Sequence, residues 1–300
     1  MYCSTTYHRL LFTTALSFFL VLLCIGCGNT SSKSHSNTIF HDDYGRDIAV
    51  PDQPQRVVSL SPAVTEIIFA LGGDDLLVGR TDFCKYPDEA QQIESIGGIS
   101  NINIEKILTL KPDLVISGSM VPKKSAEHLD AMGIPLACVI EKAQYDGLYE
   151  NIQRIGNLIN RRHEADSLVN LLKNEILDIK TDSLAKRPTL YYVVGFGAAG
   201  NFTAGGNTFI NEIIQMAGAE NIANDIKGWN YSLEALMQAD PDYILIRQED
   251  AETFVKTSPY TDLTAVKSGN VIPIESGLID LQVPRNIEAI KLIHKWVNGK

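Results

Sequence analysis

The sequence has few of the residues from which metal centres and disulfide frameworks are built. It contains six histidines in 300 residues, and no two of them lie at the spacing of metal ligands. Three of the five cysteines fall within the first 27 residues, which leaves Cys84 and Cys138. We expect no metal site, and the sequence leaves open whether these two cysteines pair.

The chain also lacks a surplus of basic residues. Lys and Arg number 26 against 36 Asp and Glu, for a formal net charge of −10. An acidic balance argues against binding to nucleic acid or to an anionic lipid surface. After residue 26 no apolar run approaches the length that spans a membrane. We therefore expect a folded body in water, with no nucleic-acid partner.

Signatures of catalysis are missing as well. The serine at position 59 or 61 lies outside the context of a nucleophile elbow, and no histidine is placed to act as its base. The segment GFGAAG at 195–200 matches a dinucleotide fingerprint, but NFTAGGN at 201–207 separates it from the next helical pattern. We expect no catalytic residues and no cofactor, with a nucleotide-using envelope enzyme as the remote alternative.

The N-terminal segment has the features of a lipoprotein export signal. An apolar run extends from Leu10 to Gly26, follows Arg9, and ends directly before Cys27. Residues 28–38 are small and polar, which is typical of a flexible tether. We expect residues 1–26 to be removed, Cys27 to carry lipid, and residues 27–42 to link the lipid to the folded body. The alternative is an uncleaved anchor, although the run is short for a membrane span.

One phrase occurs twice, 129 residues apart. The first copy is NINIEKILTLKPDLVIS at 101–117, and the second is NYSLEALMQADPDYILI at 230–246. Each predicts a short helix, a Pro-Asp stop and a buried strand, with Asn103 or Ser232 as the N-cap. The repeat indicates two similar halves.

Each copy places a glutamate in the first turn of its helix. Glu105 and Glu234 both lie seven residues before the proline. The modest interpretation is that each carboxylate stabilises the positive end of a helix dipole, by roughly 0.3–1 kcal/mol. The more specific one is that two equivalent acids suit a partner that is itself two-fold.

The order of patterns indicates an α/β protein in two lobes. Apolar strands alternate with helices in residues 43–144 and again in 163–300. Between them, the pattern from Tyr145 to Leu184 is almost wholly helical, and we assign residues 145–162 as a single long bridging helix. A cleft between two lobes is a natural site for a small ligand.

Aromatic residues follow several of the predicted strands. Rigid flat side chains in such loops can hold a large, partly apolar ligand, although packing into the core is the alternative for each. Trp229, between Gly228 and Asn230, is expected to be exposed. The candidates are Phe83, Tyr86, Phe196, Trp229 and Tyr231.

Taken together, these segments resemble the substrate-binding lipoproteins of ABC importers for vitamin B12, ferric siderophores and haem. The resemblance covers about residues 43–298. It rests on RVVSLSPAVTEIIFALG, LLVGRTDFCKYP, IGGISNINIEKILTLKPDLVISG, GGNTFINEIIQMAGAENIA, ADPDYILI, AVKSGNVIPI and PRNIEAI. It implies two Rossmann-like lobes joined by one long helix, a ligand between them, little hinge closure, and a monomer that is not an enzyme.

The resemblance also implies partners and roles. Glu105 and Glu234 match the acids that dock against arginines of the two permease subunits, which work with ATPase subunits. Phe83 falls where B12-binding members have tyrosine, and Phe196 and Trp229 fall where they have ring-stacking aromatics. Two further positions that can hold tryptophan in those members are Ile99 and Gly118 in this chain.

Three ligand classes follow from the resemblance. A corrinoid such as cobalamin is the first hypothesis, because of the TDFCKYP and GW segments. A ferric siderophore would use basic groups facing the cleft, and haem would need an iron-ligating Tyr or His. A scaffold lipoprotein without a small ligand is a further alternative. The basic candidates are Arg80, Lys85, Arg247 and Arg285, and the haem candidates are Tyr86, Tyr231 and His128.

Overall fold

The computed structural model describes residues 37–99, 101–180 and 187–299, and from Asn37 onward the chain forms one compact unit. The predicted signal at 1–26, Cys27 and the first part of the tether lie outside the described residues. Within the described part, no helix is long and apolar enough to cross a membrane.

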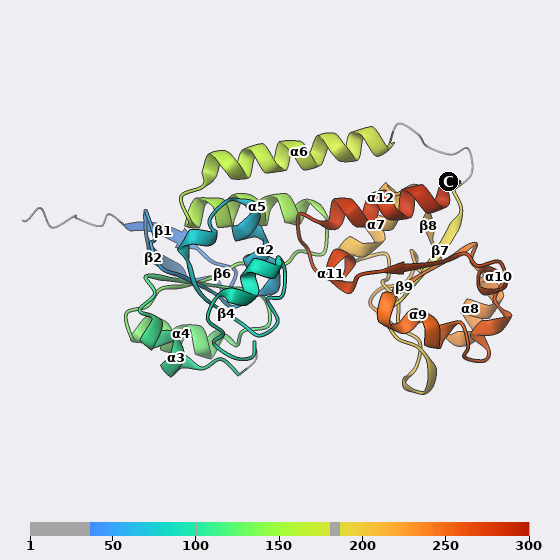
Figure 1. The fold of residues 1–300 in the computed structure, drawn as a ribbon, viewed down its shortest axis with the longest axis horizontal. Coiled ribbons are helices and arrows are strands. Elements are labelled where there is room, and N and C mark those ends of the chain that lie inside the picture. The colour runs from blue at the N-terminus through green and yellow to red at the C-terminus, as the bar shows by residue number, and fades with distance from the viewer. Residues whose placement is uncertain (1–36, 100, 181–186, 300) are drawn as a thin grey trace, which may run out of the picture. The chain divides into compact units, whose positions relative to one another are not determined.

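The first half of this unit is built on a parallel four-stranded sheet (Figure 1). Side chains of successive strand residues point to opposite faces, and each face is covered by helices. Val57 and Ile116 pack toward α2 and toward the later helix α5 (Asp146–Leu158), whereas Val58 and Val115 pack toward α3 and α4. In the order β4-β3-β5-β6, the strands are β3 Val57–Ser59, β4 Leu77–Arg80, β5 Leu114–Ser117 and β6 Leu136–Cys138, with helices α2 Pro62–Ala70, η1 Asp74–Leu76, η2 Asp88–Gln92, α3 Ile104–Leu110 and α4 Lys123–Ala131.

The second half repeats this topology. Its parallel strands lie in the order β10-β9-β7-β8, so that both sheets run second, first, third, fourth strand. Helices again cover both faces, α7 and α12 on one and α8, α9 and α10 on the other. The elements are β7 Thr189–Val193, η3 Gly197–Ala199, α7 Phe209–Met216, β8 Glu220–Asn221, α8 Leu233–Ala239, β9 Tyr243–Arg247, α9 Gln248–Phe254, η4 Tyr260–Asp262, α10 Thr264–Lys267, β10 Val271–Ile274, α11 Ser276–Ile279 and α12 Asn286–Val297.

The repeated phrase forms the same structure in both halves. The side chains of Asn103 and Ser232 accept hydrogen bonds from backbone N–H groups of the first turn, so the predicted caps are confirmed. Both helices end on a non-glycine residue in the left-handed region, Lys111 at φ 48° and Asp240 at φ 38°. The proline that follows thus marks a helix that has already ended.

The aspartate of each Pro-Asp pair joins the third strand to the first. Asp113 accepts the backbone N–H groups of Gln55 and Arg56 at 2.7 and 2.9 Å, just before β3. Asp242 accepts the N–H and the hydroxyl of Thr189, both at 2.8 Å, at the start of β7. The Pro-Asp signal is therefore a device that fixes strand pairing in each sheet.

The helical connector differs from the single bridging helix expected at 145–162. Helix α5, Asp146–Leu158, ends before Asn160, which has φ 55°, and α6, Arg162–Lys180, then runs back along it (Figure 1). A Cβ at Gly156 would lie 2.5 Å from that of Ala165, so glycine is needed for this close approach. Helix α6 packs on α5 and on α7 and α12 of the second half, and therefore contacts both halves.

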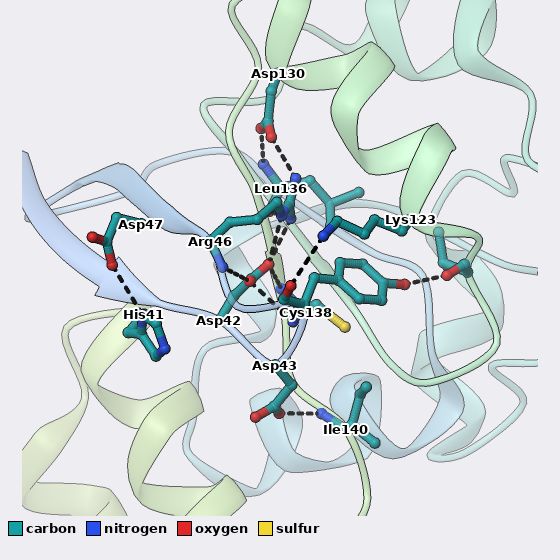
Figure 2. A network of polar contacts seen from close by, with 12 residues as sticks. His41, Asp42, Asp43, Arg46, Asp47, Lys123, Asp130, Leu136, Cys138 and Ile140 are labelled. Atoms are coloured by element: carbon teal, nitrogen blue, oxygen red, sulfur yellow. Dashed lines mark hydrogen bonds and ion pairs between the residues drawn. The ribbon is translucent and has the colours of Figure 1, made fainter.

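A hairpin precedes the first sheet and shortens the tether expected to reach residue 42. Strand β1, Asn37–His41, pairs antiparallel with β2, Asp47–Pro51. Figure 2 shows its turn fastened to the edge of the sheet at β6. Asp42 accepts from Arg46 Nε and Nη2 at 3.1 and 2.6 Å and from the backbone N–H groups of Tyr44 and Arg46. Arg46 also pairs with Asp130 and donates to the carbonyl of Leu136.

We predict that Asp42→Ala lowers the free energy of unfolding by about 3 kcal/mol, because it removes one partner of a buried pair and leaves several donors unsatisfied. The Asp42 side chain is 0% exposed. Chemical denaturation of the purified protein measures the change. Asp47→Ala is the matched control, since Asp47 pairs with His41 on the surface of the same hairpin. Its effect should stay within about 0.5 kcal/mol, and an equal loss in both variants would contradict the role of Asp42.

Candidate ligand cleft

A cavity of 540 Å³ lies between the two halves, at the carboxyl ends of the strands. This is the position at which open parallel sheets bind ligands, and the volume is typical of a small-molecule site. Most of the residues that line the cavity come just after a strand or at the start of a helix. The complete lining is Leu60, Ser61, Pro62, Phe83, Ile99, Gly118, Ser119, Met120 and Glu141 from the first half, and Phe209, Ser276, Gly277, Asp280, Leu281 and Gln282 from the second.

The wall of the cavity carries large apolar side chains that folding leaves in contact with solvent. Phe83 is 59% exposed and Met120 is 63% exposed, although large apolar side chains are usually buried. Exposed apolar groups gathered at a concave surface mark binding sites. The neighbouring lining position, Gly118, has no room for a side chain, because a Cβ there would lie 2.9 Å from Ser61 Oγ. The arrangement suits a ligand with a flat or apolar face.

Arg285 joins the two halves beneath this cavity. Its Nε and Nη2 donate to the two carboxylate oxygens of Glu66 on α2, at 2.8 and 2.9 Å, across 219 residues of sequence. Its guanidinium also lies 3.5 Å from the centroid of the Tyr86 ring and contacts Glu275. Burial raises the pKa of Glu66, and the hydrogen bonds from Arg285 oppose that rise. Arg285 is thus held by the protein and is not free for an anionic ligand.

A second polar group anchors the opposite wall. Asp280 accepts from Arg247 Nε at 2.8 Å and from the hydroxyl of Tyr192 at 2.5 Å. Burial raises the pKa of Tyr192, so its hydroxyl keeps the proton that it donates. Reciprocal bonds between Gln282 and the backbone of Lys142 add another link between the halves. These contacts preform the cavity and occupy Arg247.

The predicted aromatic residues do not all meet in this cavity. Phe83 lines it, and Tyr86 lies beside it under Arg285. Phe196 packs edge-on against Phe254 and Tyr260, at 5.2 and 5.7 Å between centroids, because its loop covers the second sheet.

The two aromatics near the second copy of the phrase also lie outside the cavity lining. Tyr231 packs on Tyr191 at 5.5 Å. Trp229 is 46% exposed, as expected from its neighbours. The loop that carries Trp229 is held by bridges from Phe202 to Gly195 and Asn230. Glycine at 205 and 206 lets residues 224–228 approach closely, because a Cβ on either glycine would meet a backbone oxygen of that segment.

The residues that an iron ligand would need have other partners or positions. Arg80 donates to the backbone carbonyls of Thr81, Ala90 and Gln91. His128 lies on the exposed side of α4, and Lys85 is exposed outside the cavity lining. Among the described residues no group of three or more His, Cys, Asp and Glu side chains is placed to hold a metal ion. Cys84 and Cys138 are both buried and free, which answers the question of their pairing.

The two repeated glutamates are available for contact with a partner. Glu105 and Glu234 lie in the first turns of α3 and α8, and both are exposed. A shallow cavity of 490 Å³ lies beside Glu234 and includes Tyr231 and Phe202. The equivalent positions in two halves of the same topology fit the expectation from the repeat.

Several cavity residues were not predicted from the sequence. Met120, Glu141, Phe209, Asp280 and Gln282 line the cavity without belonging to an aromatic motif. Three of these were detectable by position, since Met120 and Glu141 come within three residues after β5 and β6, and Phe209 begins α7. The GFGAAG segment forms the short turn η3 and does not open into a long helix.

We predict that Glu66→Ala lowers the free energy of unfolding by about 3–5 kcal/mol, because it leaves the buried Arg285 without its main partner. Thermal and chemical unfolding measure the loss. The double variant Glu66→Leu with Arg285→Met should recover much of it, since no buried charge then remains unpaired. Additive losses in the double variant would show that the pair is not coupled.

Comparison with known proteins agrees with this geometry. The family model described as "Periplasmic binding protein" matches residues 57–277. The chain is 30% identical over 295 residues to an ABC transporter substrate-binding lipoprotein of Bacillus subtilis, covering 92% of this chain and 93% of that protein. It is 30% identical over 257 residues to a cobalamin-binding protein of Halobacterium salinarum, covering 80% and 69%. Among solved structures, the periplasmic heme-binding protein RhuT of Roseiflexus sp. RS-1 matches with a TM-score of 0.72 at 25% identity, covering 81% and 99%.

Proposed function

Because this chain belongs to the periplasmic binding protein family, we propose that it captures a corrinoid such as cobalamin and delivers it to an ABC importer. The observation that carries the proposal is the preformed cavity with Phe83 and Met120 exposed on its wall. A corrin is a broad ring with an apolar face, which such a wall can cover. The named cobalamin-binding relative at 30% identity supports the same ligand class.

The charges beside the cavity favour a corrinoid over an anionic iron chelate. A ferric siderophore or the propionates of haem would be met by free basic groups. Arg247 is paired with Asp280, Arg285 with Glu66 and Glu275, and Arg80 with carbonyl oxygens. Using any of them for a ligand would break contacts that hold the protein together.

The remaining parts of the proposal concern location and partners. Export with a lipid on Cys27 would keep the binding protein at the cell envelope, next to the membrane that holds the permease. The protein acts as a monomer, with a permease dimer and its ATPase subunits as partners, and catalyses no reaction. Exposed Glu105 and Glu234 would meet basic groups on the two permease subunits, and such pairs set orientation more than affinity.

We predict saturable one-to-one binding of cyanocobalamin to the purified protein in calorimetric titration, with no comparable heat from a ferric siderophore or from haemin. Binding of the siderophore or haemin alone would keep the importer role and replace the ligand. Silence from all three would contradict capture of any of these ligands and favour a scaffold role.

The same titration tests the cavity wall. Phe83→Ala should weaken cyanocobalamin binding about tenfold, because it removes an exposed aromatic contact that the ligand would bury. Leu177→Ala is the control, since Leu177 is equally exposed but lies on α6. Equal affinity of the Phe83 variant and the control would remove Phe83 from the site.

We predict that Glu105→Ala with Glu234→Ala leaves ligand affinity unchanged and lowers ligand uptake through the cognate permease. Each exposed pair contributes about 0.2–1 kcal/mol, so the double variant should lose several-fold in apparent affinity for the permease. Glu150→Ala with Glu164→Ala, which removes the same charge from α5 and α6, is the matched control. Unaltered uptake in the first double variant would contradict docking through the repeated acids.

A further inference from the structure

The charged side chains that line the cavity are all acidic. Glu141 comes from the loop after β6 and Asp280 from the segment after α11, and the other lining residues carry no charge. Neither lysine nor arginine belongs to the lining within the described part of the chain. A ligand in the cavity can therefore contact these carboxylates directly. The nearby arginines lie outside the lining and are already paired with acids.

The two arginines beside the cavity do not balance the charge of the acids around them. Arg285 lies between two acids, Glu66 and Glu275, and Arg247 is paired with Asp280. With Glu141 included, the group contains two more acids than cations. The walls are largely apolar and concave, so the field of the unbalanced charge is screened less than at a flat, open surface.

Glu141 is the acid that a ligand can reach. Its side chain is half-buried, and its Oε2 accepts a hydrogen bond from Ser119 Oγ at 2.9 Å. No ion pair of Glu141 is found with the residues that the structure describes. Gly118 lies against the same carboxylate, at 3.3 Å from a would-be Cβ to Oε1, so no side chain at that position shields it.

We propose that this cavity selects among corrinoids by charge and binds a cationic corrinoid more tightly than a neutral or anionic one. The inference rests on the proposed corrinoid function and deepens it. A cobalt(III) corrin with one cyanide and one water on the metal carries a single positive charge. In cyanocobalamin the phosphate of the nucleotide loop cancels that charge, and no lysine or arginine is among the described residues that line the cavity to meet the phosphate. A corrinoid without the nucleotide loop is thus the preferred ligand.

Three ligands separate charge from the loss of the nucleotide. Aquocyanocobinamide is a cation without phosphate, dicyanocobinamide is its neutral counterpart, and cyanocobalamin is neutral with phosphate. Calorimetric titration of the purified protein should give the tightest binding for aquocyanocobinamide. Its advantage over dicyanocobinamide is expected to be on the order of tenfold, as for one charge near 10 Å at an effective dielectric constant of 20. High salt should reduce this ratio.

Glu141→Gln tests the residue that carries the inference, because glutamine keeps an acceptor for Ser119 and removes the charge. The ratio between the cationic and the neutral cobinamide should fall toward one in this variant. Glu164→Gln, the same change on α6 away from the cavity, should leave the ratio as in the native protein. The visible spectrum of the bound corrinoid should stay unchanged, since the attraction involves no bond to cobalt.

The outcomes separate this inference from the proposed function. Equal affinity for the three corrinoids, or a ratio that persists in Glu141→Gln, overturns selection by charge while the corrinoid function stands. A preference accompanied by a spectral change that survives Glu141→Gln points to coordination of cobalt and also overturns it. If no corrinoid binds, the proposed function and this inference fall together.

Discussion

The ion pair between Arg285 and Glu66 is the constraint on which the ligand cleft depends. It joins α2 of the first half to the segment before α12 through two hydrogen bonds of 2.8 and 2.9 Å, which constrain how the halves meet beside the cavity. Because Arg285 also stacks on Tyr86, the loop after β4 is held in the same contact. The cavity is therefore formed before any ligand arrives, which lowers the ordering cost of binding.

The duplicated topology explains why the cleft and the two exposed acids occur together. In each half, the helix of the repeated phrase is followed by a Pro-Asp pair whose aspartate binds the start of the first strand. The same phrase thus ties the third strand of each sheet to the first and leaves Glu105 or Glu234 exposed in the first helical turn. A single local pattern thus contributes to the fold and places two equivalent acids on the surface.

The local patterns of the sequence were sufficient for most elements of the fold and for much less of the site. Caps and strands followed from short-range chemistry, so Asn103, Ser232 and the strands β5 and β9 lie where they were predicted. The connector forms two antiparallel helices that approach closely where Gly156 contacts Ala165. The hydrophobic periodicity of the sequence does not predict this contact.

The cavity depends on contacts between residues far apart in sequence. Phe196 and Tyr231 follow the same loop pattern as Phe83, yet they pack on the second sheet through partners that only the tertiary structure supplies. Arg285 was a candidate for the ligand, but its partner Glu66 is 219 residues away.

We propose that the preformed cleft takes a corrin ring against its apolar wall. The most direct measurement is a crystal structure of the protein with cyanocobalamin. We expect the corrin to lie against Phe83, Met120 and Phe209, with Arg285 still paired to Glu66 and the halves at their present separation. A corrin bound elsewhere, or a broken pair with the two halves moved together, would contradict it.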